Sequence, residues 1–431
     1  MSPRRLLTFL FLANLLIYIA RYLLAGVLPA IGRAFPGTSQ AELGALASVF
    51  VVAYLISAPL FGALGDRFPR RRLLAFGAAL SALATVAVTW VTSLNELFAT
   101  RILLGFGESA FVTVAPTLVA DAYPPAKRAG AISVLTTAQP VGTALSYLIT
   151  GLLVGVGLSW RSPFWIIAIP FLLSSLGMLR LPTLPRGALD LGEAFGLDLL
   201  RPPTDAADQR TSLGHRYARL LATPSYLLNT LAMSANSFAM GGLAYWMPTY
   251  LHQARGVSMA TADIAFGSIT ATMGAAGTLS GGAIAGRLAA RRETALAWVA
   301  GIAAIAAVPL FYLWFHVHTP VALWGIMALT EFLLFIPPGP ANTLLLNVTE
   351  PAIRGVGVAL NIVLMHLLGE MLSPAIIGFF ADRANMTRGI EVAAWAIGVS
   401  GLLWIATTFF IRRDLLRVAE ALQQEVLRAR P

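Results

Sequence analysis

The chain has 431 residues, of which 57% are hydrophobic and 12% are charged, and its formal net charge is +10. A soluble protein carries about a quarter charged residues and somewhat under half apolar residues, so this composition does not fit a soluble enzyme. The absence of cysteine excludes disulfides and thiolate metal sites. Basic residues in short clusters between apolar runs also argue against a nucleic-acid-binding face.

The apolar runs predict an all-α polytopic membrane protein, because about 20 residues suffice for one membrane-spanning helix. Twelve spans are predicted, at residues 6–31, 42–63, 73–92, 94–121, 129–155, 162–181, 225–251, 263–286, 294–315, 320–347, 355–381 and 390–411. The first run resembles a signal peptide, but it is too long, carries Arg21 and lacks a small-residue cleavage site. We therefore interpret it as the first span.

The placement of basic residues predicts the orientation of these spans. Of the 30 basic residues, 23 lie in the terminal segments and in the connections on the same side of the membrane as the termini, and five lie in the connections on the other side. Cytoplasmic segments carry an excess of arginine and lysine. Both termini are therefore expected to be cytoplasmic.

The polar interval at 182–222 divides the spans six and six and predicts a cytoplasmic linker between an N-terminal bundle (1–181) and a C-terminal bundle (223–411). Similar patterns of glycine, proline and basic residues occur on both sides of this interval: the pattern at 62–71 recurs 220 residues later, and the pattern at 125–130 recurs 226 residues later. Two parallel six-span halves that hold substrate at mid-membrane are the organisation of the major facilitator superfamily. The tail at 412–431 has helical apolar spacing and predicts an amphipathic helix on the cytoplasmic leaflet.

The connection after the second span resembles that superfamily's signature loop. We expect a cytoplasmic latch there, in which glycines allow close helix approach and Asp66 caps a neighbouring helix or pairs with an arginine of the next cytoplasmic connection. The alternative is a generic positively charged loop. The latch residues are Gly62, Asp66, Arg67, Arg71 and Arg128.

Two arginines and three glutamates lie inside predicted spans and away from the span ends, where an isolated charge costs about 2.5 to 3.5 kcal/mol. Arg21 and Glu108 each lie about 21 to 23 Å into their spans at 1.5 Å per residue, so they should meet near the midplane. Arg101 precedes Glu108 by seven residues on the same helical face. We expect an Arg21–Glu108 pair, with Arg101 as second partner or as an outer station for an anionic headgroup. The alternative is a static pair that only orients helices, and for Glu331 functional and structural roles are equally compatible with the sequence.

His366 and Glu370 are four residues apart and are neighbours on one helical face. They would form a proton station, since histidine titrates near neutrality, or a satisfied interhelical hydrogen bond. No third ligand accompanies them, so no metal site is predicted.

Aromatic and amide side chains on the fourth, seventh and tenth spans would give an apolar wall opposite a polar midplane, which suits an amphiphile with one acyl chain. Packing is the alternative for each of them. The expected substrate-binding set is Arg21, Arg101, Glu108, Phe111, Asn236, Tyr245, Trp246, Glu331, Phe335 and His366, and the expected proton-coupling set is Glu108, Arg21, His366 and Glu370. Prolines within spans, including Pro116, Pro337, Pro338, Pro340 and Pro374, are expected to kink or unwind them.

A narrower resemblance covers nearly the whole chain. The segments Ala25–Pro29, Gly105–Ser109, Ala115–Asp121, Thr223–Tyr226 and His366–Glu370, with Ser373, Pro374 and Gly378, resemble the Spinster family. The resemblance implies a prokaryotic-type exporter of lysolipids or sphingoid lipids that is monomeric and lies in a bacterial inner membrane. Family members typically carry an Asp-Arg pair in the first span, whereas this chain has Ala20-Arg21. The resemblance implicates the missing aspartate in proton coupling, which leaves Glu108 as the expected proton carrier.

The sequence therefore predicts a secondary active transporter that moves an amphiphilic lipid by alternating access, driven by a proton gradient and without a cofactor. The alternative is a proton-linked drug exporter or organic-anion carrier of the same superfamily. A membrane enzyme is disfavoured because no HExxH motif, nucleophile elbow or phosphate-binding loop occurs. The six-plus-six duplication and the latch disfavour a channel.

Overall fold

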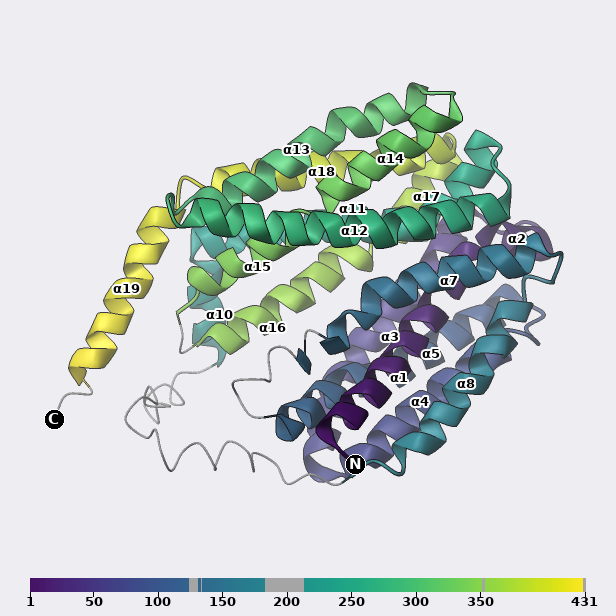
Figure 1. Ribbon diagram of the computed structural model, residues 1–431, viewed down its shortest axis with the longest axis horizontal. Helices are drawn as coiled ribbons and strands as arrows, with labels where there is room; N and C mark the ends of the chain where they lie inside the picture. Colours follow the sequence, from purple (N-terminus) through teal and green to yellow (C-terminus); the bar gives the residue numbers. More distant parts are fainter. Residues whose placement is uncertain (124–130, 133, 183–212, 351–352, 429–431) are drawn as a thin grey trace. The chain divides into compact units, whose positions relative to one another are not determined.

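The computed structural model describes residues 1–123, 131–132, 134–182, 213–350 and 353–428. These described residues form helices joined by short connections, without a strand (Figure 1). They divide into two compact units. Unit 1 contains Met1–Leu200, Ala244–Ala271 and Pro374–Met386, and unit 2 contains Arg201–Leu243, Thr272–Ser373 and Thr387–Pro431.

Unit 1 is a bundle of long helices that run side by side (Figure 1). Helices α3 and α4 pack against α5, α1 packs against α7, and α8 packs against α4. The helices are α1 (Pro3–Gly26), α2 (Leu28–Ala34), α3 (Gln40–Arg67), α4 (Arg70–Ala87), α5 (Leu94–Ala122), α7 (Ala138–Gly155) and α8 (Ser162–Met178).

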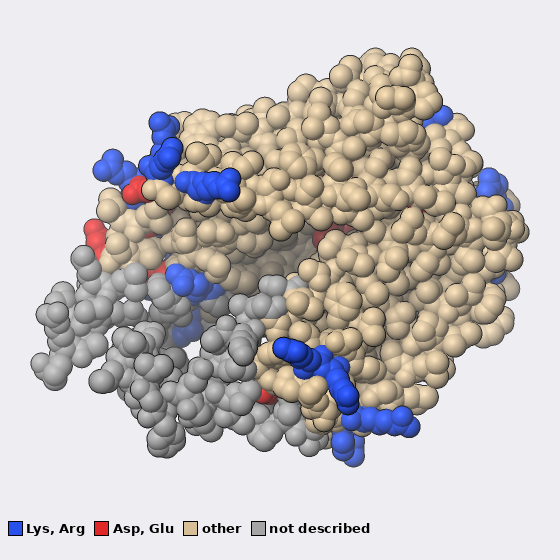
Figure 2. Space-filling view, in the orientation of Figure 1, with Lys and Arg blue, Asp and Glu red and all other residues tan. Residues whose placement is uncertain are grey.

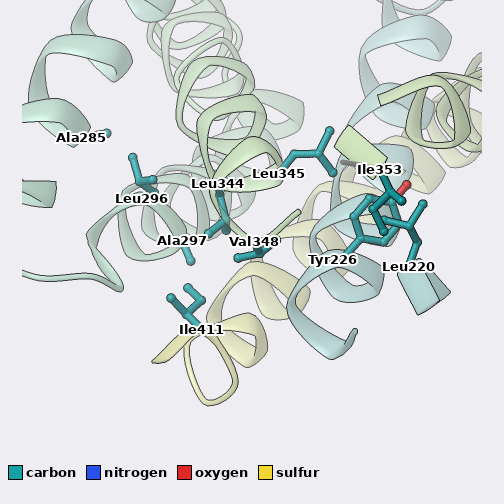
Figure 3. Close-up of a cluster of buried hydrophobic side chains, with 10 residues drawn as sticks. All are labelled: Leu220, Tyr226, Ala285, Leu296, Ala297, Leu344, Leu345, Val348, Ile353 and Ile411. Carbon is teal, nitrogen blue, oxygen red and sulfur yellow. The ribbon is translucent and has the colours of Figure 1, made fainter. Parts of the chain in front are cut away.

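Unit 2 holds most of the second half of the chain. Its helices are α10 (Leu213–Leu221), α11 (Pro224–Arg255), α12 (Met259–Ala289), α13 (Ala295–His316), α14 (Pro320–Leu334), α15 (Pro338–Asn347), α16 (Arg354–Met365), the π-helical turn η3 (His366–Glu370), α18 (Met386–Thr407) and α19 (Ile411–Arg428), of which α11 and α12 continue into unit 1. Helix α17 (Ser373–Arg383) belongs to unit 1 from Pro374 onward. Figure 3 shows one buried cluster of this unit, in which the side chains of Tyr226, Leu220 and Ile353 gather together. The Tyr226 hydroxyl donates to the carbonyl oxygen of Gly357 at 2.7 Å, so the buried phenol is satisfied.

Within the described residues, each predicted span corresponds to a helix or to a broken helix. Eight of the described helical segments are long and apolar enough to cross a membrane. The surface over α13 and α14 is free of charged side chains in the view of Figure 2, and exposed apolar residues such as Ile302, Leu313 and Val321 lie on these helices. Apolar side chains around a whole helix are typical of a helix in contact with lipid. The chain is therefore an all-α polytopic membrane protein.

Proline breaks three of the predicted spans. The first is divided after Gly26, and Pro29 lies in the first turn of α2. The tenth is divided between α14 and α15 at Pro337 and Pro338, and the eleventh ends its π-helical turn before Ser373-Pro374. Proline has no N–H, and its ring clashes with the carbonyl four residues earlier, which explains why the helices restart at these positions. Pro116, by contrast, lies inside the unbroken helix α5.

Close backbone contacts explain why parts of α11, α12 and α17 belong to unit 1. The carbonyl oxygen of Pro374 lies against Gly44 of α3, and that of Gln40 lies against Gly378 of α17. Neither glycine position leaves room for a Cβ atom. The Asp382 carboxylate then accepts hydrogen bonds from the backbone N–H groups of Gln40 at 2.7 Å and Ala41 at 2.8 Å. We call this contact between α17 and the first turn of α3 the α3 clasp.

These units do not coincide with the predicted bundles, because the unit boundaries cut through α11 and α12. The predicted boundaries at residues 181 and 223 therefore stay a prediction. Most of the predicted linker lies outside the described residues, and its described end forms α10.

The predicted amphipathic tail is a helix, α19, and its first turns pack on unit 2. Asp414 is fully buried and its Oδ2 accepts a hydrogen bond from the backbone N–H of Ser225 at 2.9 Å. Ser225 is the second residue of α11, so Asp414 satisfies an amide group that the helix itself leaves without a partner. Its negative charge also faces the positive end of the helix dipole.

We expect Asp414→Ala to lower the free energy of unfolding by about 0.5 to 2 kcal/mol, the usual loss when a helix N-terminus loses its capping side chain. Asp414→Asn keeps one oxygen acceptor and should lose less. Denaturant unfolding in detergent micelles would measure both. Glu420→Ala is the matched control, since Glu420 is exposed on the same helix; an equal loss for Asp414→Ala and Glu420→Ala would contradict the capping role.

Candidate functional site

Arg21 on α1 and Glu108 on α5 form the expected ion pair inside unit 1. The Arg21 Nε and Nη2 atoms donate to Glu108 Oε2 at 2.9 and 2.7 Å. The Glu108 side chain is fully buried, and 12% of the Arg21 side chain is exposed. The second carboxylate oxygen, Oε1, is also buried and has no hydrogen-bond partner. The carboxylate therefore keeps one oxygen available for a proton or a ligand.

Arg101 lies on the same helix as Glu108 and is almost completely buried. Its Nη2 donates to the backbone carbonyl of Arg21 at 3.1 Å, and its Nε has no hydrogen-bond partner. The structure therefore places Arg101 beside the pair through the backbone of α1. No ion pair forms between Arg101 and Glu108.

Three aromatic rings surround the Arg21 guanidinium. Its carbon lies 4.7 Å from the ring centre of Phe50, 4.9 Å from that of Tyr18 and 5.6 Å from that of Tyr54. The Arg101 guanidinium lies 5.3 Å from the same Phe50 ring. Cation–π attraction at these distances stabilises guanidinium groups that have lost part of their hydration.

The cluster of Arg21, Arg101 and Glu108 carries two positive charges and one negative charge, all largely removed from water. Such an excess charge is costly in a low-dielectric interior unless another group compensates it. An anionic group that enters the cluster would supply that compensation. We call these three residues the charge cluster.

The sequence did not single out Tyr18, Phe50 and Tyr54. Tyr18 precedes Arg21 by three residues, and Phe50 and Tyr54 are four residues apart, so each spacing places two side chains on one helical face. The i,i+3 spacing to a charged residue was therefore a usable signal for Tyr18. The packing of the aromatic face of α3 against α1 is a tertiary contact, and the sequence pattern did not predict it.

Other expected lining residues of unit 1 are packed. Phe111 and Trp246 are buried, and the indole N–H of Trp246 donates to the carbonyl of Pro374 at 2.8 Å. Tyr245 donates its hydroxyl to the carbonyl of Leu43 at 2.7 Å. These contacts give Tyr245 and Trp246 a role in holding α11 to α3 and α17, and their role as substrate ligands stays a prediction.

In unit 2, Glu331 on α14 is buried, and none of the described residues forms an ion pair with it. Phe335 begins the break after α14, and its ring lies against Gly274 of α12. Asn236 on α11 donates to the sulfur of Met240 at 3.2 Å, and its buried Oδ1 has no hydrogen-bond partner.

His366 and Glu370 form the expected pair at the ends of the π-helical turn η3. His366 Nδ1 lies 3.0 Å from Glu370 Oε2, and about a quarter of each side chain is exposed. Ser237 of α11 donates to Glu370 Oε1 at 3.5 Å. A π-helical turn inside an α-helix is costly and frequently marks a functional position.

The predicted latch lies largely outside the described part of the chain. Arg128 falls in an interval that the structure leaves out, and the side chains of Asp66 and Arg67 are likewise not described. The described part of the same loop contains a different ion pair, between Arg70 of α4 and Asp121 of α5. An ideal Cβ position on Gly62 lies 3.6 Å from the Thr113 side chain of α5, which is an ordinary van der Waals contact between α3 and α5.

Sequence reasoning also missed Asp263, near the start of α12 in unit 1. This carboxylate is fully buried, and neither oxygen has a hydrogen-bond partner. The residue opens the eighth predicted span, where a charge is commonly assigned to the membrane surface. The position of Asp263 at the start of a span therefore did not predict its burial, which results from tertiary packing.

The fold and the site together define a membrane transporter with a buried charge cluster. Residues 10–369 match the Major Facilitator Superfamily, and the chain belongs to that superfamily. Within it the chain belongs to the Spinster family: it is 31% identical to protein spinster homolog 1 of Xenopus laevis, over 97% of this chain and 83% of that protein. It is therefore a transporter and not an enzyme.

Two further relatives have informative names. The chain is 28% identical to the sphingosine-1-phosphate transporter SPNS2 of Mus musculus, over 96% of this chain and 79% of that protein. It also superposes, with a TM-score of 0.81 and 20% identity, on a bacterial homolog of the human lysosomal transporter Spinster, solved in an inward-facing and unoccupied conformation, over 96% of this chain and 98% of that chain. This likeness confirms the predicted fold.

The charge cluster makes a prediction about stability. Glu108→Gln leaves Arg21 and Arg101 without a negative partner and should lower the free energy of unfolding by about 3 to 5 kcal/mol, as for other broken buried pairs. Adding Arg101→Met removes one of the two positive charges. The loss of stability in the double variant should therefore be smaller than the sum of the two single losses, by about 0.5 to 3 kcal/mol. Denaturant unfolding in micelles completes the cycle. Strict additivity would show that the two residues do not share one electrostatic site.

Proposed function

We propose that this protein moves an anionic amphiphilic lipid, of the lysolipid or sphingoid type, across the membrane by alternating access and that protons drive the movement. The observation that carries the proposal is the excess positive charge of the charge cluster, buried among the rings of Tyr18, Phe50 and Tyr54. An anionic headgroup would neutralise the excess charge, and an apolar chain would remain against aromatic and aliphatic side chains. The name of the mouse relative, a sphingosine-1-phosphate transporter, supports this substrate class.

The coupling follows from competition for Arg21. An anionic headgroup that draws Arg21 away would leave the Glu108 carboxylate desolvated and without its cation, and burial disfavours a charged carboxylate. Glu108 would then take up a proton through its free oxygen Oε1. Substrate and proton therefore bind together, and the return of Arg21 to Glu108 accompanies the release of both.

The His366–Glu370 pair supplies a second proton station in this proposal. An imidazole at 3.0 Å from a carboxylate can hold a proton between them, and both side chains remain partly exposed. Because the pair occupies the π-helical turn, a change in its charge acts on the broken span that contains η3 and α17.

The substrate class has a direct test. A lysolipid with a phosphate headgroup should co-purify with the protein, be identified by mass spectrometry of the extracted lipid, and compete for binding. Arg101→Met should weaken its binding by about tenfold or more, since a hydrogen bond to a charged group contributes about 1.5 to 3 kcal/mol. Arg412→Met, a change to an exposed arginine on α19, is the control and should leave binding unchanged.

Uptake of short organic acids without competition from lysolipids would overturn the lipid assignment. It would favour an organic-anion carrier or drug exporter of the same superfamily. Both substrates would meet the same positive charge, so the acyl chain is the part that the competition assay distinguishes.

Proton coupling is tested by Glu108→Gln in proteoliposomes. The variant should lose transport driven by a pH gradient, because the neutral amide of glutamine cannot take up a proton. It should keep part of the exchange of internal for external substrate, which needs no net proton movement. Glu420→Gln, at an exposed carboxylate of α19, should retain both activities. An unchanged dependence on the pH gradient in Glu108→Gln would remove Glu108 as the proton carrier.

A further inference from the structure

The contact between α7 and the first turns of α12 in unit 1 is unusually close. An ideal Cβ placed on Gly151 of α7 would lie 2.9 Å from the carbonyl oxygen of Ala260 and 3.0 Å from the Cβ of Asp263. One turn further, a Cβ on Gly155 would lie 3.1 Å from the Cβ of Ala260. Gly267 of α12 reciprocates, with a Cβ position 3.0 Å from the carbonyl oxygen of Ala144. Small residues four apart allow helix backbones in membranes to approach in this way.

This contact closes over Asp263. The side chain has no exposed surface, and neither carboxylate oxygen has a hydrogen-bond partner. The polar group that faces it is the hydroxyl of Thr150 on α7, which is itself hydrogen-bonded to the carbonyls of Ser146 and Tyr147 at 3.0 Å. A charged carboxylate in such surroundings would be left without solvation.

Among the described elements around Asp263, no charged side chain would compensate a negative charge on its carboxylate. On α7 the titratable neighbour is Tyr147, whose hydroxyl donates to the carbonyl of Ala244. At the end of α11, His252 Nδ1 lies 2.9 Å from the carbonyl of Val257, and Arg255 forms no ion pair with Asp263. On α1 the residue that meets Thr150 is Gly26.

We propose that Asp263 is a further protonation site, distinct from the charge cluster and from the His366–Glu370 pair, at which one proton is bound when α7 and α12 close against each other. In the closed contact the side chain is a neutral carboxylic acid. When the first turns of α12 separate from α7, water reaches the side chain, its O–H bond breaks and the proton passes to that water. Closing reverses the step, so acid stabilises the closed contact and base stabilises the open one.

The proposal has a quantitative consequence. If one proton is bound on closing, the ratio of closed to open protein falls by up to about tenfold for each unit of pH increase. The proton comes from and returns to the same aqueous phase. Asp263 therefore sets the pH range in which the contact opens, and it need not carry protons across the membrane.

The absence of cysteine allows a clean test. Gly155→Cys with Ala260→Cys introduces two thiols whose Cβ positions lie 3.1 Å apart in the closed contact. Disulfides join Cβ atoms about 3.5 to 4.5 Å apart, so a separation of a few tenths of an ångström brings this pair into range. The rate of oxidative cross-linking then reports closure. It should be measured across pH in the full chain in proteoliposomes, and again with Asp263→Asn added, because the ratio of the two rates cancels the pH dependence of thiol chemistry.

We expect the cross-linking rate with Asp263, divided by the rate with Asp263→Asn, to fall with increasing pH by up to about tenfold per unit. The same fall is expected when Glu108→Gln is present. A ratio that does not change with pH would overturn the proposal, and so would a pH dependence that disappears with Glu108→Gln. Thr150→Val, which leaves Asp263 in place, provides a second variant if Asp263→Asn does not fold. Loss of the hydroxyl removes the polar group that faces the Asp263 side chain, so the midpoint of the pH dependence should shift, and an unchanged midpoint would also count against the proposal.

Discussion

Two arginines and one glutamate share a small buried volume of unit 1, and removal of these charges from water constrains everything around them. Arg21 must reach Glu108 with two donors, Arg101 must find a backbone carbonyl, and the ring of Phe50 lies against both guanidinium groups. These requirements fix the depth of α1, α3 and α5 relative to one another within the unit. The same requirements leave a positive excess that ordinary packing does not remove, and this excess is the basis for proposing an anionic ligand at the site.

Asp263 shows the opposite solution to the same desolvation cost. Glu108 lies beside the Arg21 cation, whereas the surroundings of Asp263 offer the hydroxyl of Thr150 and the close backbone contact at Gly151, which suit a neutral acid. We propose that protons act on both arrangements, on occupancy of the charge cluster and on closure of a helix contact. The two responses are separable because the sites involve different helix pairs.

Hydropathy and charge placement predicted the helices and the Arg21–Glu108 pair, because span length and depth are local quantities. The internal repeat across residues 182–222 predicted the superfamily fold. Proline positions such as Pro337 and Pro374 also located most of the helix breaks. What remained hidden depends on tertiary contact: the aromatic faces of α1 and α3, the Arg70–Asp121 pair and the burial of Asp263. Asp263 is the clearest example, since a carboxylate at the start of a span looks solvated until a second helix covers it.

The α3 clasp has a consequence for how this sequence can vary. Its donors on α3 are backbone N–H groups, which every residue type except proline possesses. Substitutions at Gln40 or Ala41 therefore leave the contact intact, while its acceptor is the single carboxylate of Asp382. The two sides of the contact therefore differ in how much substitution they tolerate. The α3 side can vary in evolution or in protein engineering, whereas the α17 side requires the carboxylate of Asp382. Gly44 and Gly378 must also stay small, because neither position has room for a Cβ atom.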